Sequence, residues 1–317
     1  MTALEILLAR VVDYAGLFPP AALDLAAAVR QFGEHRASAE RWMLGRLVVP
    51  AARLGDLAEA MTTEVPNGSA AWRLAVLATA PLDPAGGLGI AWGIDLARIT
   101  AFRVACDAPV NALELRGGDA DALALARRAA ADAGVAPAAT FVEVPWGADH
   151  DALARAAHAH GVSLKLRTGG VTADAFPDAD VVVRFVAACV ARGVSFKLTA
   201  GLHHALRGEH ALTYEPGCAR GTMHGFLNAL AATALLADGH DAGAVQPLLE
   251  ERDVGALAFD DGGLRWRGLG AGLTAVRAAR RAFASFGSCS FAEPVAELRA
   301  LGLLPAAAGA ALAATDD

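Results

Sequence analysis

The sequence of 317 residues is poor in several features that define common classes of protein. Its four cysteines, Cys106, Cys189, Cys218 and Cys289, show no CxxC spacing. This argues against a zinc ribbon and against a disulfide framework. The net charge is −7, no basic run is present and there are only two tyrosines. A nucleic-acid-binding surface is therefore not expected.

Long hydrophobic stretches are also missing, although hydrophobic residues make up 55% of the chain. Much of this fraction is alanine, which favours helices. The most apolar stretches, such as 306–314, are far shorter than the roughly 20 residues that span a bilayer. The first ten residues include Glu5 and no basic segment before an apolar core, unlike a signal peptide. We therefore expect a cytoplasmic protein with no membrane partner, and the Ala-rich helix faces are compatible with a homodimer.

Short apolar runs alternate with amphipathic, Ala-rich segments along most of the chain. Eight strands are predicted, at 11–16, 46–49, 73–78, 112–116, 140–144, 164–168, 195–199 and 256–259. Helices are predicted at 21–32, 51–61, 120–133, 148–159, 176–192 and 223–237. This alternation favours an α/β fold of the (β/α)8 TIM-barrel class over an open doubly wound sheet. Segment 99–105 also resembles a strand, so the strand count stays open.

The C-terminal part shows a different pattern. A Gly-rich turn within 259–266 separates apolar residues and predicts a hairpin. A helix is predicted over 273–283, and Ser290 with Glu293 matches a capping box for a last helix through Leu301. We therefore expect a (β/α)8-like barrel at 1–260 and a C-terminal helical and hairpin extension at 261–317 that packs on it.

Four successive strands each carry one ionisable residue between apolar neighbours, namely Glu114, Glu143, Lys165 and Lys197. Because side chains alternate along a strand, these four residues should share the face that points into the barrel. Two acids and two bases can neutralise one another there, which lowers the cost of burying charge. The same pattern also fits an ion-pair layer that merely fills the barrel.

Polar residues and glycines follow these strands, near the C-terminal mouth where barrels of this class hold their active sites. Arg167 supplies a bidentate donor for an anion, and glycines leave backbone N–H groups open for a phosphate or carboxylate. We therefore predict a site for a small anionic substrate. The predicted binding residues are Arg116, Arg167, Thr168, Gly169, Gly170, Thr199, Gly201, His203, His224 and Asn228. Asp13 and Tyr14, at the end of the first predicted strand, are further candidates of lower rank.

Two motifs around the lysines carry a family resemblance. Leu164-Lys165-Leu166-Arg167-Thr168-Gly169 resembles the Lys-x-x-Thr-Gly motif of the deoxyribose-phosphate aldolases, which are class I aldolases built on a (β/α)8 barrel. Phe196-Lys197-Leu198-Thr199-Ala200-Gly201 is similar to the Phe-Lys-x-x-Gly-Gly motif on the next strand of that family, with Ala200 in place of the first glycine. The resemblance is local to these two segments.

The resemblance implies a lyase in which Lys165 forms a Schiff base and Lys197 lowers the pKa of Lys165. Glu114 or Glu143 would match the acid of the family, and the sequence does not decide between them. General chemistry points the same way, because burial and a second cation both disfavour a charged lysine. A nearby carboxylate would then move protons while the imine forms. This mechanism requires no cofactor.

Two alternatives remain open. His203, His204 and His224 could hold a divalent metal ion in a metal-dependent barrel lyase or hydrolase. Their spacing matches no standard zinc signature, so our first prediction includes no metal. The second alternative is a non-catalytic barrel that binds a small anion.

Overall fold

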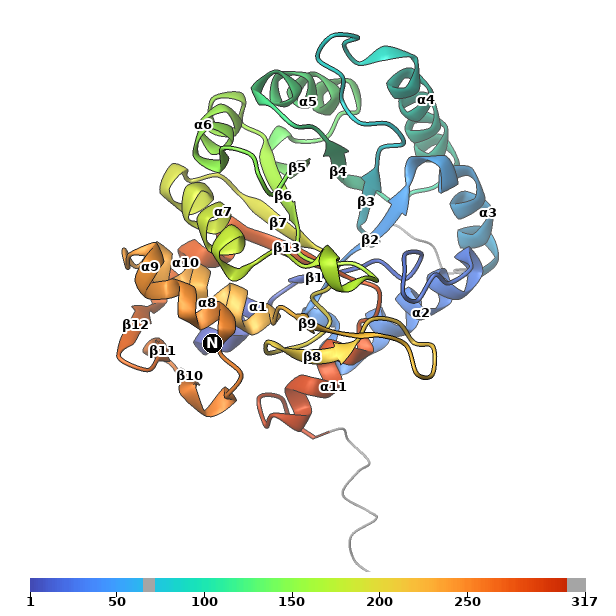
Figure 1. Cartoon of the computed structure of the whole chain (residues 1–317). Helices are drawn as coiled ribbons and strands as arrows, with labels where there is room; N and C mark the ends of the chain where they lie inside the picture. Colours follow the sequence, from blue (N-terminus) through green and yellow to red (C-terminus); the bar gives the residue numbers. More distant parts are fainter. Residues whose placement is uncertain (65–71, 307–317) are drawn as a thin grey trace, which may run out of the picture.

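A closed barrel of eight parallel strands forms the centre of the molecule, in the spatial order β1, β13, β7, β6, β5, β4, β3, β2. The computed structural model describes residues 1–64 and 72–306. The barrel strands are β1 (Val12–Tyr14), β2 (Leu44–Pro50), β3 (Leu74–Leu77), β4 (Val110–Arg116), β5 (Thr140–Val144), β6 (Ser163–Arg167), β7 (Phe196–Thr199) and β13 (Phe283–Ser288). Helices surround the strands (Figure 1), so the predicted (β/α)8 class is confirmed.

The surrounding helices are α2 (Leu25–Ala37), α3 (Leu54–Glu64), α4 (Gly89–Ala105), α5 (Ala120–Asp132), α6 (His150–His160), α7 (Ala179–Arg192), α8 (Phe226–Ala237) and α10 (Leu273–Ala282). Local sequence sets several of their ends. Asp119 and Asp149 cap the N-termini of α5 and α6 by accepting backbone N–H groups. Gly161 and Gly193 end α6 and α7 in the left-handed conformation that glycine adopts without strain. Among the described helices, none is long and apolar enough to cross a membrane.

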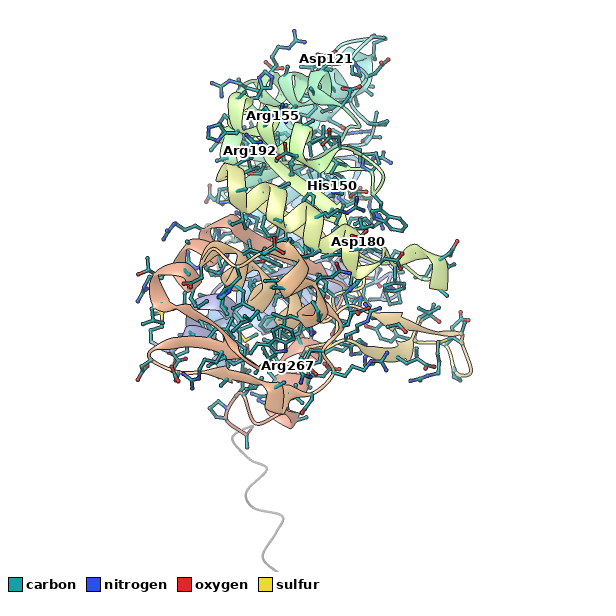
Figure 2. All side chains as sticks on the ribbon, turned by 60° about the vertical axis from the view of Figure 1, so that its left-hand side comes forward. Asp121, His150, Arg155, Asp180, Arg192 and Arg267 are labelled. Carbon is teal, nitrogen blue, oxygen red and sulfur yellow. The ribbon has the colours of Figure 1, made fainter. Side chains whose placement is uncertain are left out.

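Ion pairs on the outside join neighbouring helices of this ring. Asp151 of α6 accepts from Arg155 of the same helix at 2.8 Å and from Arg192 of α7 at 3.1 Å (both arginines are labelled in Figure 2). These side chains are substantially exposed, so each pair contributes little to stability. The most deeply buried ion pairs lie inside the barrel instead.

The eighth barrel strand differs from the predicted one. Segment 256–259 contributes to β10 (Leu257–Phe259), which forms a separate antiparallel sheet with β11 (Gly263–Trp266) and β12 (Leu269–Gly272). The barrel is closed by β13, whose small residues Ala284, Ser285 and Gly287 give a weak strand signal. The closing strand therefore lies within 261–317, the range predicted as the extension. Segment 99–105 belongs to α4 and is not a strand.

The remaining elements lie around the ends of the barrel. They are α1 (Ala3–Leu8), β8 (Gly208–Ala211), β9 (Arg220–Met223), α9 (Ala242–Val245) and α11 (Ala292–Ala300). The predicted hairpin is confirmed as β10 and β11, and the helix predicted over 273–283 is α10. Ser290 Oγ accepts the Glu293 N–H at 3.2 Å, which is one half of the predicted capping box before α11.

Two different groups of side chains fill the lumen. Val48, Ala75, Ala112 and Phe141 form a small apolar cluster contributed by β2 to β5. The charged residues of β1 and of β4 to β7 occupy the rest of the interior. Because an apolar neighbourhood weakens screening, the charges must satisfy one another locally.

Candidate functional site

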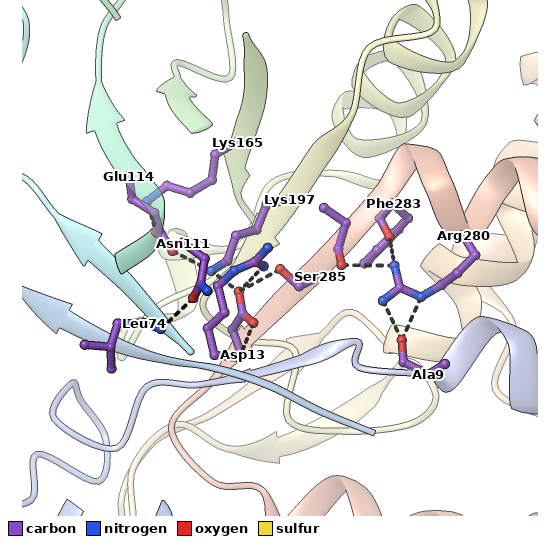
Figure 3. A network of polar contacts seen from close by, with 12 residues as sticks. Ala9, Asp13, Leu74, Asn111, Glu114, Lys165, Lys197, Arg280, Phe283 and Ser285 are labelled. Carbon is purple, nitrogen blue, oxygen red and sulfur yellow. Dashed lines mark hydrogen bonds and ion pairs between the residues drawn. The ribbon is translucent and has the colours of Figure 1, made fainter. Parts of the chain in front are cut away.

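Two lysines and three carboxylates form one network in the lumen, and all of them except Glu143 are buried. Figure 3 shows Lys165, Lys197, Asp13 and Glu114 of this network. Lys165 Nζ lies 2.9 Å from Glu114 Oε2 and 2.8 Å from Glu143 Oε2. Lys197 Nζ lies 2.7 Å from Asp13 Oδ2 and also contacts Glu114 Oε1. The four residues expected to share the inner face therefore do so, and Glu114 bridges the two lysines.

Strand register explains this convergence. Lys165 of β6 is the register partner of Glu143 on β5 and of Lys197 on β7. Residues at the same level of neighbouring parallel strands project to the same side, so the three side chains enter the lumen together. Glu114 sits one strand further along, on β4, and reaches across to both lysines.

Asp13 completes the network from the first strand. Its Oδ2 accepts Ser285 Oγ at 2.7 Å as well as Lys197, and its Oδ1 accepts the backbone N–H of Arg46 at 2.8 Å. The sequence pattern predicts Asp13 at the end of a strand but does not identify its ion-pair partner. The partner, Lys197, is 184 residues away and meets Asp13 only because the barrel closes.

The charges hold one another in the ionised state. Burial alone would raise the pKa of Glu114, but Lys165 and Lys197 outweigh burial and hold that pKa far below its usual range. Lys165 shows the converse: burial lowers its pKa, while Glu114 and Glu143 outweigh burial and raise it above 10.5. The sequence predicts a lowered pKa for Lys165, but the net pKa is raised, because both carboxylates lie within hydrogen-bond distance of the Lys165 amine.

A cavity of about 540 Å³ opens above this network at the C-terminal mouth of the barrel. Apolar side chains, among them Phe18, Val48 and Leu77, line one side of it. The predicted site residues that line it are Glu114, Arg116, Glu143, Lys165, Arg167, Gly170, Lys197, Thr199 and His203. Charged groups at an apolar wall, in a cleft of this size, are typical of a small-molecule site.

The two arginines at the mouth differ in how firmly they are held. Arg167 is half exposed and its Nε lies 3.4 Å from Glu143 Oε1. Arg116 donates to the carbonyl of Thr79 at 3.0 Å and is also exposed. Both arginines line the cavity and keep guanidinium N–H groups without a partner among the described residues, so either can bind an anionic group of a ligand.

Three of the predicted binding residues have a structural role. Thr168 Oγ1 donates to the carbonyl of Ala200 at 2.8 Å, which ties the loop after β6 to the loop after β7. A Cβ added to Gly169 would lie 2.7 Å from Gly201 Cα, so the two loops approach too closely for a side chain. Gly201 also has a φ of 72°, which favours glycine. None of the three lines the cavity.

The structure does not bring His224 and Asn228 to the cavity. His224 Nε2 donates to the carbonyl of Pro177 at 2.7 Å, and burial lowers the pKa of this imidazole to about 4. Asn228 donates to the carbonyls of Leu248 and Glu251 at 2.7 and 2.9 Å. Both side chains satisfy buried polar groups, and neither lines the cavity.

His203 lies at the mouth as predicted, but sequence patterns did not reveal the polar groups around it. His203 Nδ1 lies 3.1 Å from Ser288 Oγ, 3.7 Å from Cys289 Sγ and 3.4 Å from Glu293 Oε2. Burial lowers the pKa of His203, but Cys289 and Glu293 outweigh burial and raise it to about 9. Cys289 lines the same cavity as the lysines. Its only sequence signal is its place directly after β13, a strand that the apolar pattern does not predict.

The candidate metal ligands also differ from those predicted. Within the described ranges, one group of side chains has metal-ligating atoms close enough together, namely His204, His210 and Glu297, whose donor atoms lie within 4.8 Å of one another. His203 and His224 are not part of it. The imidazoles of His204 and His210 stack with ring centroids 3.3 Å apart, and His204 pairs with Glu297. The hairpin β8–β9 supplies His210, which sequence spacing could not connect with α11.

The basic residues of the buried network are both lysines, which is unusual for this chain. Of its 27 basic residues, only Lys165 and Lys197 are lysines, and all others are arginines. An arginine keeps its charge under all ordinary conditions, whereas a lysine can release a proton and become a nucleophile. The two lysine amines of the chain therefore occur where a proton acceptor and a cavity are both present.

Comparisons with known proteins give no family: no protein-family model matches the chain, and no curated protein matches it significantly.

Proposed function

We propose that the protein is a lyase that acts on a small anionic carbonyl compound through a Schiff base on Lys165. The observation that carries this proposal is the placement of both lysines of the chain in one buried network at the floor of the mouth cavity. A layer that only filled the barrel would be served equally well by arginine. The local resemblance to the class I aldolases supports the same assignment.

Lys165 is a better nucleophile candidate than Lys197 because of its partners. Lys197 is held between Asp13 and Glu114, whose side chains are 1% and 3% exposed. Lys165 shares one carboxylate with Lys197, but its other partner, Glu143, is 16% exposed. Of the carboxylates that pair with a lysine and line the cavity, Glu143 is therefore more accessible to a substrate than Glu114. This geometry favours Glu143 over Glu114 as the proton carrier.

The proposed reaction starts from the ion pair. Arg167 or Arg116 holds the anionic group, and the Lys165 ammonium gives one proton to Glu143 as the substrate carbonyl displaces the carboxylate. The amine then attacks the carbonyl carbon, and the carbonyl oxygen leaves as water after it gains two protons, one from nitrogen and one from Glu143. The resulting iminium accepts the electron pair of the adjacent C–C or C–H bond as that bond breaks and becomes an enamine. A C–H proton passes to the Glu143 carboxylate, whereas a carbon fragment leaves as a second carbonyl compound. Protonation of the enamine carbon restores the iminium, and its hydrolysis then frees Lys165.

Hydrogen exchange tests this function with a panel of compounds, so the natural substrate need not be identified first. A ketone or aldehyde bound as an iminium loses its α-protons readily, so incubation in D2O should introduce deuterium that proton NMR detects. We expect exchange with at least one member of a panel of small phosphorylated or carboxylated carbonyl compounds. Lys165→Ala should abolish this exchange while circular dichroism shows an intact fold. Full exchange in that variant would overturn the proposal.

A metal-dependent lyase or hydrolase is the second candidate, and the cluster of His204, His210 and Glu297 favours it. His210 Nε2 is buried and has no hydrogen-bond partner within the described part of the chain, so this nitrogen is available to coordinate a metal ion. Elemental analysis of the purified protein separates the candidates. A stoichiometric divalent metal that is lost in His210→Ala, together with loss of activity, would favour the metal mechanism.

A further inference from the structure

A second cavity, of about 330 Å³, lies at the other end of the barrel and is lined by six arginines. The arginines are Arg10, Arg46, Arg73, Arg277, Arg280 and Arg281. We refer to it as the arginine cavity. No acidic residue lines it among the residues that the structure describes, although the chain as a whole carries a net charge of −7. Such a concentration of one charge sign requires a physical explanation.

The barrel topology creates this cluster from distant segments. Arg10 precedes β1, Arg46 lies near the start of β2 and Arg73 directly precedes β3. The other three arginines lie on α10: Arg277 is at its middle, and Arg280 and Arg281 are in its last turn, where the negative end of the helix dipole favours cations. The cavity is therefore at the N-terminal face of the barrel, opposite the mouth with Lys165.

The positive charge in the cavity is poorly compensated. Arg280 donates to the backbone carbonyls of Ala9 and Phe283 (Figure 3), so its partners are neutral. Arg46 has an acid within reach, but its Nη1 is 3.7 Å from Asp13 Oδ2, an oxygen that already accepts from Lys197 and Ser285. The Nε of Arg46 is buried and has no acceptor among the described residues.

The other four arginines of the cavity have side-chain N–H donors without protein partners among the described residues. Across 1–64 and 72–306, the side chains of Arg10, Arg73, Arg277 and Arg281 make no ion pair or hydrogen bond with protein groups that the structure describes. Burial lowers the pKa of Arg73, and Arg46 and Arg10 lower it further. The charges thus repel one another, and the side-chain N–H groups of these four arginines are available to an anion in the cavity that they line.

We propose that the arginine cavity binds a small phosphorylated polyanion of the diphosphate class. Phosphoryl oxygens pair with the planar fork of arginine in a bidentate manner, and two adjacent phosphoryl groups can engage several guanidinium groups at once. The cavity is large enough for such a group and lies apart from the anion-binding arginines of the mouth, Arg116 and Arg167. This proposal does not depend on the catalytic function proposed above.

Calorimetric titration of the full chain with inorganic diphosphate tests the proposal, at an ionic strength fixed with sodium chloride. Arg277→Gln combined with Arg281→Gln removes two exposed charges whose side chains form no hydrogen bond or ion pair with the described residues, so the fold should be unaffected. We expect one binding site in the wild type and at least tenfold weaker binding in this double variant. Arg128→Gln combined with Arg252→Gln changes the net charge equally at exposed positions outside the cavity, and should leave the affinity unchanged.

Three results would overturn the proposal. The first is the absence of diphosphate binding, and the second is an equal loss of affinity in both double variants, which would indicate attraction by net charge alone. The third is binding that Arg167→Gln removes and the Arg277/Arg281 variant retains, which would place the anion at the mouth. A titration with citrate distinguishes the ligand chemistry, because equal affinity for this polycarboxylate would contradict recognition of phosphoryl groups.

Discussion

Lys165 and Lys197 are register partners on neighbouring parallel strands, and their amines contact opposite oxygens of one carboxylate, that of Glu114. Two cations at adjacent positions inside a barrel would repel one another strongly without this anion between them. The arrangement makes Glu114 the electrostatic centre of the network. It leaves Glu143, on the cavity side, as the carboxylate that can change partner during a reaction.

Glu114→Gln should therefore destabilise the protein strongly. The amide removes the anion shared by the two buried ammonium groups and leaves each with one carboxylate, Glu143 for Lys165 and Asp13 for Lys197. Removing one partner from a buried charge network costs about 3–5 kcal/mol. Glu143→Gln should cost clearly less, because the Glu143 side chain is 16% exposed and water can compensate. Urea denaturation of both variants measures the difference. Equal free energies of unfolding would contradict the central role of Glu114.

Glu143→Gln should instead impair catalysis. Loss of a positioned proton carrier typically lowers a rate by about 10²–10⁴-fold. We expect such a decrease in the rate of α-proton exchange, with little change in substrate affinity, because Arg167 and Arg116 remain in place. The alternative assignment, with Glu114 as the carrier, predicts a near-normal rate for a folded Glu143→Gln variant, and kinetic measurements on that variant decide between the two.

The pH dependence of the reaction rate should reveal the proton that Lys165 and Glu143 share. Glu143 has a pKa below its usual value and Lys165 has one above 10.5, so the pair holds one proton across the neutral range. Transfer of this proton from Lys165 to Glu143 does not change the number of protons that the protein binds. The wild-type rate should therefore be flat between about pH 6 and pH 8.

In Glu143→Gln the internal acceptor is gone, and the rate should follow the small fraction of free Lys165 amine. It should then rise about tenfold per pH unit over the same range. A wild-type rate that itself rises through neutral pH would indicate a lysine with a lowered pKa and would contradict the ion-pair starting state.

Much of this site follows from sequence, since strict alternation predicts that Glu114, Glu143, Lys165 and Lys197 share one face. The alternation has a period of two, and a closed barrel allows buried charge only toward the lumen. The partner of Asp13 could not be inferred, because the contact between the first and the seventh strand depends on how the barrel closes.

Other features lacked a usable signal. The closing strand β13 has small residues at four of its six positions and no run of apolar residues, so neither its residues Ser285 and Ser288 nor the following Cys289 could be placed at the site. His224 and Asn228 flank the start of α8 at helical spacing, but spacing does not tell which way that end of the helix faces. Their side chains turn to Pro177, Leu248 and Glu251, away from the cavity.

His203 should make the stability of the protein decrease at alkaline pH. Its pKa is about 9 in the folded protein against 6.5 in the unfolded chain, so its contribution is complete below pH 6.5 and is lost as the pH rises through 9. Linkage gives a contribution on the order of 3 kcal/mol. The free energy of unfolding, measured from about pH 6.5 to pH 9.5, should fall by this amount in the wild type. An unchanged fall in His203→Gln would assign the effect to other groups.

Borohydride trapping tests the central claim most directly. Reduction of the protein in the presence of the carbonyl panel converts a Schiff base into a stable amine, and only Lys165, Lys197 and the α-amino group can carry it. Peptide mass spectrometry should locate the added mass on Lys165, and Lys165→Arg should abolish it. An adduct on Lys197 alone, or no adduct with a compound that the protein demonstrably turns over, would contradict Schiff-base catalysis at Lys165.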